Sequence, residues 1–315
     1  MHKRNFPFPD YPIGWFQVAY SNELAPGEVK PLEYWGRGLV LYRTDGGEAV
    51  LLDAYCPHLG AHLGYGGTVE GSDIRCPFHA WEFGTNGMCT KIPYGTTRIS
   101  PKAKVKQWVT REINGLIMAW FHPNEEAAHF EVPEIPEWAS DKWTDYTIRS
   151  WKIRSRNQEM GENAVDSAHF HYLHGTKNIP ASVAQVDGHI LRVDAPTVST
   201  NKYGDVEGMI HVEMHGFGFT TTRFTGIVET LLVNSVTPID EEYLDVRFSF
   251  LVKKLSDRGS TETIGKLYTA EIERQLEQDI PIWENKIYVR PPILSDGDGP
   301  IGKYRKWCKQ FYADE

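Results

Sequence analysis

Two short segments, each with one cysteine and one histidine, place the strongest constraint on this chain. His58 follows Cys56 by two positions, and His79 follows Cys76 by three positions. Two thiolates and two imidazoles on two loops can hold a two-iron, two-sulfur cluster in which imidazoles bind one of the irons. The sequence therefore predicts two loops that come together around an iron–sulfur cluster.

A structural zinc site is the alternative, because two Cys and two His also satisfy tetrahedral zinc. Zinc fingers usually pair Cys with Cys and His with His, whereas both pairs here are mixed. Each cysteine is followed by proline, and tight turns are favoured by Gly60, Gly64, Gly66 and Gly67. The spacing favours the cluster, and the pattern resembles that of a Rieske cluster.

Length and charge bound the class of protein. The 315 residues suffice for two domains, and a hydrophobic content of 41% is ordinary for a globular protein. A net charge of −9 argues against a nucleic-acid partner, because phosphate binding needs a basic face. We expect the one short basic cluster to be a solvated face of a terminal helix; it comprises Lys303, Arg305, Lys306 and Lys309.

The length of the apolar stretches and the number of cysteines indicate where the protein is located and whether it enters a membrane. No stretch approaches 18 uninterrupted apolar residues, so we expect no signal peptide and no membrane span. Cys89 and Cys308 remain after the cluster ligands, and they are expected to stay free thiols in a reducing compartment. The sequence thus predicts a cytoplasmic protein.

Chain order predicts an α+β fold of two domains. Short β-type runs between Trp15 and Phe121 indicate a small antiparallel β domain, with a tight hairpin turn at Asn114-Gly115. A Pro- and Glu-rich segment begins near Pro123, and we place the boundary there, giving domains 1–122 and 123–315.

The second domain reads as a mixture of strands and helices. Residues 146–156 indicate a strand, 157–175 a helical stretch that ends at Gly175, and 189–254 the strands of one curved antiparallel sheet. Residues 261–285 are helical, and a last short helix is marked by Tyr304, Trp307 and Phe311.

A second metal site is indicated within 157–175 by Asp166, His169 and His174. Positions five apart are separated by about 140° on an ideal helix, so the two histidines can share a metal only if the helix is distorted or ends. The third ligand should be a carboxylate, completing the two-His, one-carboxylate face typical of ferrous iron that binds dioxygen. Candidates on the late helix are Asp279, Glu277 and Glu273, and Asp279 is preferred because it lies near the end of that helix.

Together, CPHLGAHLGYGG, CPFHAW and ENAVDSAHFHYLH resemble the oxygenase (alpha) component of the Rieske non-haem iron oxygenases over nearly the whole chain. The resemblance implies a Rieske domain followed by a helix-grip catalytic domain. It implies that Cys56, His58, Cys76 and His79 hold the cluster and that His169, His174 and Asp279 hold the iron. It also implies that Asp166 bridges His79 of one chain and His169 of the next in a ring of subunits, expected to be a homotrimer. Asn163 matches a family Asn near the iron.

Departures from the family pattern are few. Leu59 and Ala80 stand where many members have Arg and Gly, and the loss of Arg bears on which electron donor docks. Of the remaining histidines, His62 is expected to be a loop residue near the cluster, and His171 to point away from the iron. His211 and His215 are interpreted as ordinary strand histidines, with lining of a substrate cavity as the alternative.

Within the family, similarity to the steroid-acting group is greatest, which includes 3-ketosteroid 9α-hydroxylases and sterol 7-desaturases. The expected activity is hydroxylation of a small apolar, steroid-like substrate with dioxygen. Electrons are expected from NAD(P)H through a separate ferredoxin-type reductase. Alternatives are a sterol desaturase, an oxygenase or demethylase of an aromatic or N-methyl compound, and a Rieske electron carrier without catalysis. The residues beyond the β domain speak against the last of these.

Overall fold

The computed structural model describes residues 6–201, 204–226 and 228–313, and it divides into two compact units. The smaller unit comprises Phe16–Phe121 and Ile239–Glu241, and the larger unit takes the other described residues. The first domain had been expected to begin at the N-terminus. Residues 6–15 instead belong to the larger unit, where the Ile13 amide donates to the carbonyl of Phe311 at 2.7 Å.

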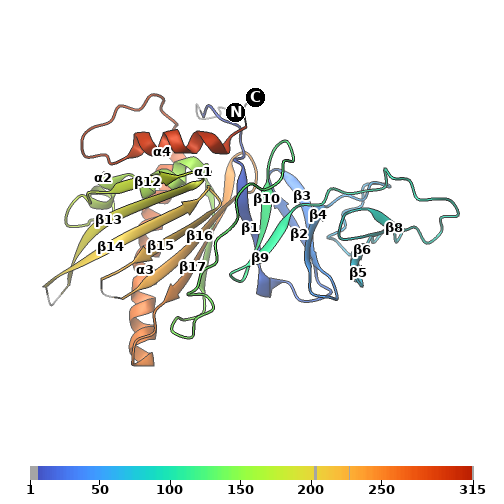
Figure 1. Cartoon of the computed structure of the whole chain (residues 1–315), viewed down its shortest axis with the longest axis horizontal. Helices are drawn as coiled ribbons and strands as arrows, with labels where there is room; N and C mark the ends of the chain where they lie inside the picture. The colour runs from blue at the N-terminus through green and yellow to red at the C-terminus, as the bar shows by residue number, and fades with distance from the viewer. Residues whose placement is uncertain (1–5, 202–203, 227, 314–315) are drawn as a thin grey trace. The chain divides into compact units, whose positions relative to one another are not determined.

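The smaller unit consists of short antiparallel sheets, as expected for the N-terminal domain (Figure 1). A hairpin turn at Asn114-Gly115, with φ of 56° and 75°, joins two of its strands and confirms the predicted turn. The three sheets have the strand orders β1 (Gly14–Tyr20), β10 (Leu116–Phe121), β9 (Thr110–Ile113); β2 (Val29–Tyr34), β3 (Arg37–Arg43), β4 (Ala49–Asp53); and β5 (Thr68–Glu70), β6 (Asp73–Arg75), β7 (Glu82–Phe83), β8 (Cys89–Lys91). A 3-10 turn, η1 (Ser21–Glu23), follows β1.

The larger unit is built on one seven-stranded antiparallel sheet. Its strands are β11 (Thr147–Arg154), β12 (Val183–Asp187), β13 (Ile190–Asn201), β14 (Gly204–His215), β15 (Phe219–Phe224), β16 (Thr230–Pro238) and β17 (Tyr243–Val252). Strands β12 to β17 are neighbours in chain order, and β11 pairs with β17 at one edge. The alternating pattern of residues 189–254 therefore predicted the sheet correctly.

The long helix α3 (Arg258–Asn285) lies against one face of this sheet (Figure 1). Its Leu276 and Trp283 share a buried cluster with Val246 and Phe248 of β17. Even-numbered residues of β17 face the helix because side chains alternate along a strand. The chain ends in α4 (Ile301–Cys308) and η3 (Lys309–Phe311), the short helix that the aromatic residues had indicated.

Residues 157–175 form three short pieces rather than one helix: α1 (Asn157–Gly161), η2 (Glu162–Ala164) and α2 (Ser167–Tyr172). Asp166 has an extended backbone, with φ −82° and ψ 100°, and its side chain accepts from the amide of His169 as an N-cap. The segment is anchored by Arg305 of α4, whose guanidinium contacts both oxygens of Glu162 at 2.6 and 2.9 Å. Arg305 is therefore not part of a solvated basic face, contrary to the expectation.

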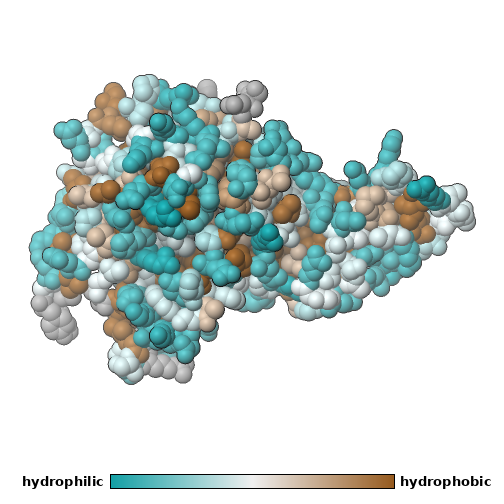
Figure 2. Space-filling model, in the orientation of Figure 1, coloured by the Kyte–Doolittle hydropathy of each residue, from teal (hydrophilic) through white to brown (hydrophobic). Residues whose placement is uncertain are grey.

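No helix among the described residues is long and apolar enough to cross a membrane. On the face shown in Figure 2, hydrophobic residues form small separate groups among hydrophilic ones. Cys89 and Cys308 are buried and form no disulfide, as expected.

Candidate metal centres

The two Cys/His loops of the smaller unit share one backbone scheme. In the first, which follows β4, the Cys56 amide donates to Ala61 and the Gly60 amide donates to Cys56. In the second, between β6 and β7, the Cys76 amide donates to Trp81 and the Ala80 amide donates to Cys76, at the same spacings. The two loops therefore present their cysteines in matching turns, although the histidine stands one position later in the second.

These loops bring the four predicted cluster ligands together. The rings of His58 and His79 lie 4.6 Å apart between centroids. Burial, and then the neighbouring Cys76, raise the pKa of the Cys56 thiol to about 11. A bound metal deprotonates such a thiol outright. The Nδ1 atom of His58 is buried and has no hydrogen-bond partner among the described residues, and an unpaired polar atom of this kind fits a metal ligand.

Aromatic side chains fix the ligand rings of the cluster loops. The Trp81 ring stacks on His58 at 4.6 Å and 7°, and its Nε1 donates to the hydroxyl of Tyr94 at 2.9 Å. The outer side of the loops is apolar and exposed, since Leu59 is 66% and Phe78 is 61% exposed. Ala80 adopts a left-handed φ of 56°, the conformation that favours the Gly found here in many family members.

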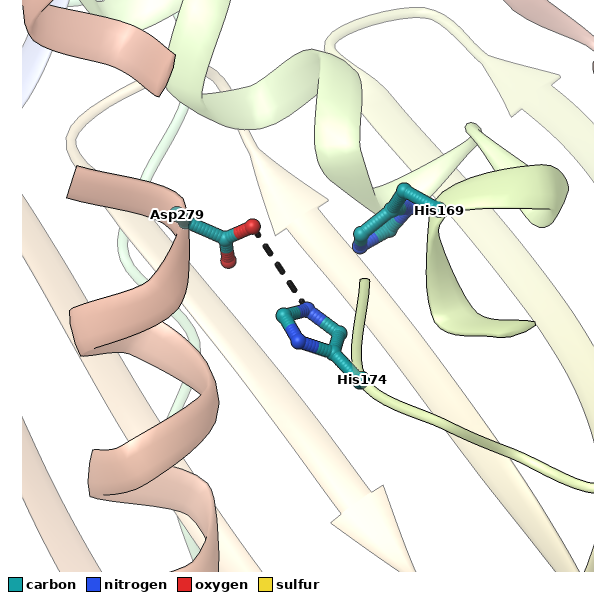
Figure 3. Close-up of side chains that lie close together, drawn as sticks. All are labelled: His169, His174 and Asp279. Carbon is teal, nitrogen blue, oxygen red and sulfur yellow. Dashed lines mark ion pairs between the residues drawn. The ribbon is translucent and has the colours of Figure 1, made fainter. Parts of the chain in front are cut away.

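In the larger unit, His169, His174 and Asp279 converge from α2, the segment after it and α3 (Figure 3). One potential ligand atom of each lies within 4.8 Å of the others, and His174 Nε2 is 3.5 Å from Asp279 Oδ1. Of the other two carboxylate candidates, Glu277 is exposed and Glu273 pairs with Arg149 at 2.8 Å. The choice of Asp279 agrees with this geometry.

The end of α2 makes the convergence possible. His174 lies beyond the last helical residue, and its amide donates to the carbonyl of His169, a bond over five residues that is typical of a π turn. Gly175 follows with a left-handed φ of 77°. The helix thus both ends and is distorted here, as the five-residue spacing of the histidines required.

Hydrogen bonds orient both imidazoles. Nδ1 of His169 contacts the backbone carbonyl of Asp166 at 2.6 Å, and Nδ1 of His174 contacts the side-chain carbonyl of Gln278 at 3.1 Å. Since carbonyl oxygens only accept, each Nδ1 carries the proton and each Nε2 is left for a metal. This donor set, two neutral imidazoles and one carboxylate, fits ferrous iron.

Burial and charge act differently on the two rings. Burial lowers the pKa of His169, which favours the neutral, metal-binding form. For His174 burial also lowers the pKa, but hydrogen bonds to Asp279 and Gln278 outweigh it and raise the pKa. A metal at the triad would take the place of the proton between His174 and Asp279.

A mostly apolar cavity adjoins the triad, between α3 and the sheet. His169, His174 and Asp279 form part of its wall. Its apolar lining includes Met160, Phe170, Ile210, Val212, Met214, Phe217, Phe224, Leu232, Val236, Phe248, Ile272, Leu276 and Trp283. A mostly apolar pocket beside a candidate iron site suits an apolar ligand.

Asp166 and Asn163 lie close to the triad. The Asp166 carboxylate contacts the amide of His169 at 3.3 Å but is 3.9 Å from its ring nitrogen, so within one chain it does not hydrogen-bond to the ring. Asn163 lines the cavity and accepts from Trp283 Nε1 at 3.3 Å. Gln278 was missed by sequence reasoning, because its only signal was its place next to Asp279.

The other histidines take structural roles. His62 Nδ1 accepts from the Gly64 amide, and His171 Nδ1 contacts the Thr176 carbonyl, away from the triad. His211 pairs with Asp194 and His215 with Glu213, both on the odd-numbered face of β14, whereas the cavity is lined by even-numbered residues. The cavity-lining alternative for these two histidines is wrong.

Comparisons with known proteins agree with both centres. Residues 14–108 match the Rieske [2Fe-2S] domain, and residues 119–312 match the 3-ketosteroid 9alpha-hydroxylase C-terminal domain. The oxygenase component of a 3-ketosteroid-9-alpha-monooxygenase from Rhodococcus rhodochrous is 32% identical over 96% of this chain and 82% of its own. A cholesterol 7-desaturase from Xenopus laevis is 31% identical over 97% of this chain and 73% of its own.

Solved structures share the fold at low identity. Dicamba monooxygenase aligns with a TM-score of 0.78 at 16% identity, covering 96% of this chain and 98% of that one. NdmB of Pseudomonas putida CBB5 aligns with a TM-score of 0.75 at 18% identity, covering 94% and 89%.

The chain is a Rieske non-haem iron oxygenase, a class of enzymes with a 2Fe-2S cluster, a mononuclear iron and dioxygen as co-substrate. Within that class it belongs to the family with the 3-ketosteroid 9alpha-hydroxylase C-terminal domain.

Proposed function

We propose that this oxygenase hydroxylates a steroid-like substrate, a 3-ketosteroid, with electrons from an NAD(P)H-dependent, ferredoxin-type reductase. The observation that carries the proposal is the apolar cavity whose wall includes His169, His174 and Asp279. Its lining of aliphatic and aromatic residues suits a large, uncharged ring system. The steroid names of the curated relatives support the same substrate class.

In this proposal the two centres have separate ligands and separate tasks. Cys56, His58, Cys76 and His79 would hold the cluster, and His169, His174 and Asp279 the iron. When bound there, the iron supplies dioxygen activation. Gln278 and the Asp166 carbonyl keep both imidazoles turned toward the metal, Asn163 holds Trp283 at the cavity wall, and the apolar lining keeps water from the reacting carbon.

For electron entry we propose that Asp166 links the cluster of one subunit to the iron of the next, through His79 and His169. Supporting this role, the Asp166 side chain is 34% exposed and sits directly before α2, where a group of another chain can reach it. The arrangement requires a ring of subunits, and a homotrimer is our proposal. The mass of the native assembly by light scattering tests it, and a monomeric active enzyme would exclude it.

We propose a functional division near residue 122, with the cluster loops in 1–122 and the catalytic site in 123–315, although residues 6–15 pack within the larger unit. For location we propose the cytoplasm, which suits an NAD(P)H-dependent donor and the two unbridged thiols Cys89 and Cys308.

The test of function is turnover of a panel of keto-steroids, sterols and aromatic acids with a generic reductase and ¹⁸O-labelled dioxygen. Hydroxylation should give a steroid product that carries one labelled oxygen atom. Omission of the reductase and replacement of the iron ligand His169 by Ala are the controls. If no member of the steroid panel reacts while an aromatic acid does, the substrate proposal is wrong.

A desaturase is the second candidate, because the cholesterol 7-desaturase of Xenopus laevis is nearly as similar as the hydroxylase relatives. The same mass measurement separates the two, since desaturation removes two hydrogens and leaves no label. Oxidation of an aromatic or N-methyl compound is the remaining alternative; the panel already covers aromatic acids, and an N-methyl compound is added to test the other case. A pure electron carrier does not suit a chain that has a second group of residues able to bind a metal, His169, His174 and Asp279.

A further inference from the structure

One row of side chains crosses the sheet beneath the cavity. The register pairs Met214 of β14 with Thr220 of β15, Thr220 with Asn234 of β16, and Asn234 with Phe248 of β17. All four residues line the cavity. Directly paired residues of adjacent antiparallel strands bring their side chains together, so Thr220 and Asn234 form a polar pair between two apolar neighbours.

The polar groups of these two side chains are not used in hydrogen bonds within the described part of the protein. Among the described residues, neither the Thr220 hydroxyl nor the Asn234 amide has a protein hydrogen-bond partner, although Thr220 is only 6% exposed. The other amides of the cavity are occupied. Asn157 donates to the Val236 carbonyl, Asn163 accepts from Trp283, and Gln275 donates to Glu271.

An unpaired amide and hydroxyl in an apolar cavity lose hydrogen bonds unless a ligand or water restores them. The Asn234 amide and the Thr220 hydroxyl can both donate, and a carbonyl oxygen accepts two hydrogen bonds. No charged side chain lines the cavity apart from the metal-binding groups, so the ligand oxygen is uncharged.

We propose that Thr220 and Asn234 bind the carbonyl oxygen of the substrate and thereby determine which ring carbon faces the iron. The inference deepens the proposed function and rests on it. It assigns the specificity of the cavity to a pair of residues: the apolar lining accepts the ring system, and the polar pair sets its orientation.

The experiment compares a 3-ketosteroid, its 3-hydroxy counterpart and the same ring system without oxygen at that carbon, using the holoenzyme with its reductase. Asn234→Leu should lower kcat/KM for the ketone by about tenfold or more, because one buried donor is lost. The compound without the oxygen should react equally well with variant and wild type. Nuclear magnetic resonance of the products should show oxidation spread over several ring carbons.

Matched variants separate recognition from packing. Thr220→Val should reproduce the loss and Thr220→Ser, which keeps the hydroxyl, should restore it. Thr221→Val is the control, because Thr221 is the next residue of β15, faces the other side of the sheet and is not among the residues that line the cavity. Cluster absorption and iron content verify that each variant is folded and loaded.

The outcomes are distinct. Equal losses for the ketone and for the compound without oxygen, or the same selective loss in Thr221→Val, would overturn the proposal. A loss confined to the 3-hydroxy compound would overturn the carbonyl assignment. If wild type converts no steroid, the proposed function fails, and the pair is then tested on whichever carbonyl compound the substrate panel identifies and on its carbonyl-free analogue.

Discussion

The two metal centres of this chain are built in opposite ways. The proposed cluster ligands lie between Cys56 and His79, on two loops with the same backbone hydrogen bonds and with exposed apolar residues at their tips. The proposed iron ligands lie between His169 and Asp279 and meet only because α3 crosses the sheet. His174 and Asp279 are each 8% exposed. A site that exchanges electrons with a partner can lie at a surface, whereas a site that oxidises an apolar substrate must be enclosed.

The largest expected effect separates the two centres. His174→Ala removes one of three iron ligands, so turnover should be abolished, while the cluster keeps its visible absorption because none of its ligands changes. Iron analysis should show loss of only the mononuclear metal. His171→Ala, on the same segment but bonded away from the triad, is the control and should retain activity. Joint loss of both metals would show that the centres are not independent.

The next effect concerns the link between the centres. Asp166→Asn keeps the size of the side chain and an oxygen that can cap α2, but it removes the charge. If Asp166 joins His79 of one subunit to His169 of another, turnover should fall by about 100-fold while both metals remain bound. In a single-turnover experiment the cluster should stay reduced in the presence of substrate and dioxygen. Rapid reoxidation of the cluster in this variant would rule the link out.

The contrast between the centres also explains what the sequence could reveal. Cysteine and histidine spacing predicted the cluster loops because all four ligands are local, and the period of two predicted the large sheet. Asp279 was one of three candidate carboxylates on its helix, and only the packing of α3 shows that Glu273 is engaged by Arg149. Gln278, Thr220 and Asn234 carried no local signal, because their roles arise from neighbours far away in the chain. One continuous helix was expected over residues 157–175, but a new helix begins after Asp166, whose side chain caps it.

A smaller effect is expected from the residue that orients His174. Gln278→Leu removes the acceptor at Nδ1, and loss of such a partner typically weakens metal affinity by about 10- to 100-fold. Gln278→Glu retains an acceptor and should bind iron at least as well as wild type. Iron titration of apo protein monitored by competition with a chelator measures both. Gln275→Leu is the control, because Gln275 lies three residues earlier on α3 and bonds to Glu271 instead. Equal affinity in Gln278→Leu would show that the hydrogen bond is incidental.

Acid should lower the stability of the larger unit through a buried histidine that lies outside the metal site. His215 donates from Nε2 to Glu213 at 2.7 Å, its Nδ1 is buried without a partner among the described residues, and burial lowers its pKa. The unfolded chain therefore binds the proton first, and stability is lost as pH falls below about 6.5, by up to about 1.4 kcal/mol per pH unit. The free energy of unfolding in urea should differ less between pH 7.5 and pH 5.5 for His215→Gln than for wild type. His211→Gln, exposed on the same strand, should leave the difference unchanged.

The smallest effect tests whether the two cluster loops are equivalent. Ala80 and Gly60 occupy the same position of the shared backbone scheme, with left-handed φ of 56° and 78°. Ala80→Gly should stabilise the smaller unit by about 1 kcal/mol, because a Cβ disfavours this conformation. Gly60→Ala should destabilise it by a similar amount, since an added Cβ there meets no atom within 4 Å and only the backbone penalty remains.

Urea midpoints followed by cluster absorption measure this pair of variants. Shifts of opposite sign and similar size would confirm that the two loops carry the same backbone requirement. A neutral Ala80→Gly would mean that the loop relaxes around alanine, and the two halves of the cluster site would then differ in rigidity as well as in the position of their histidines.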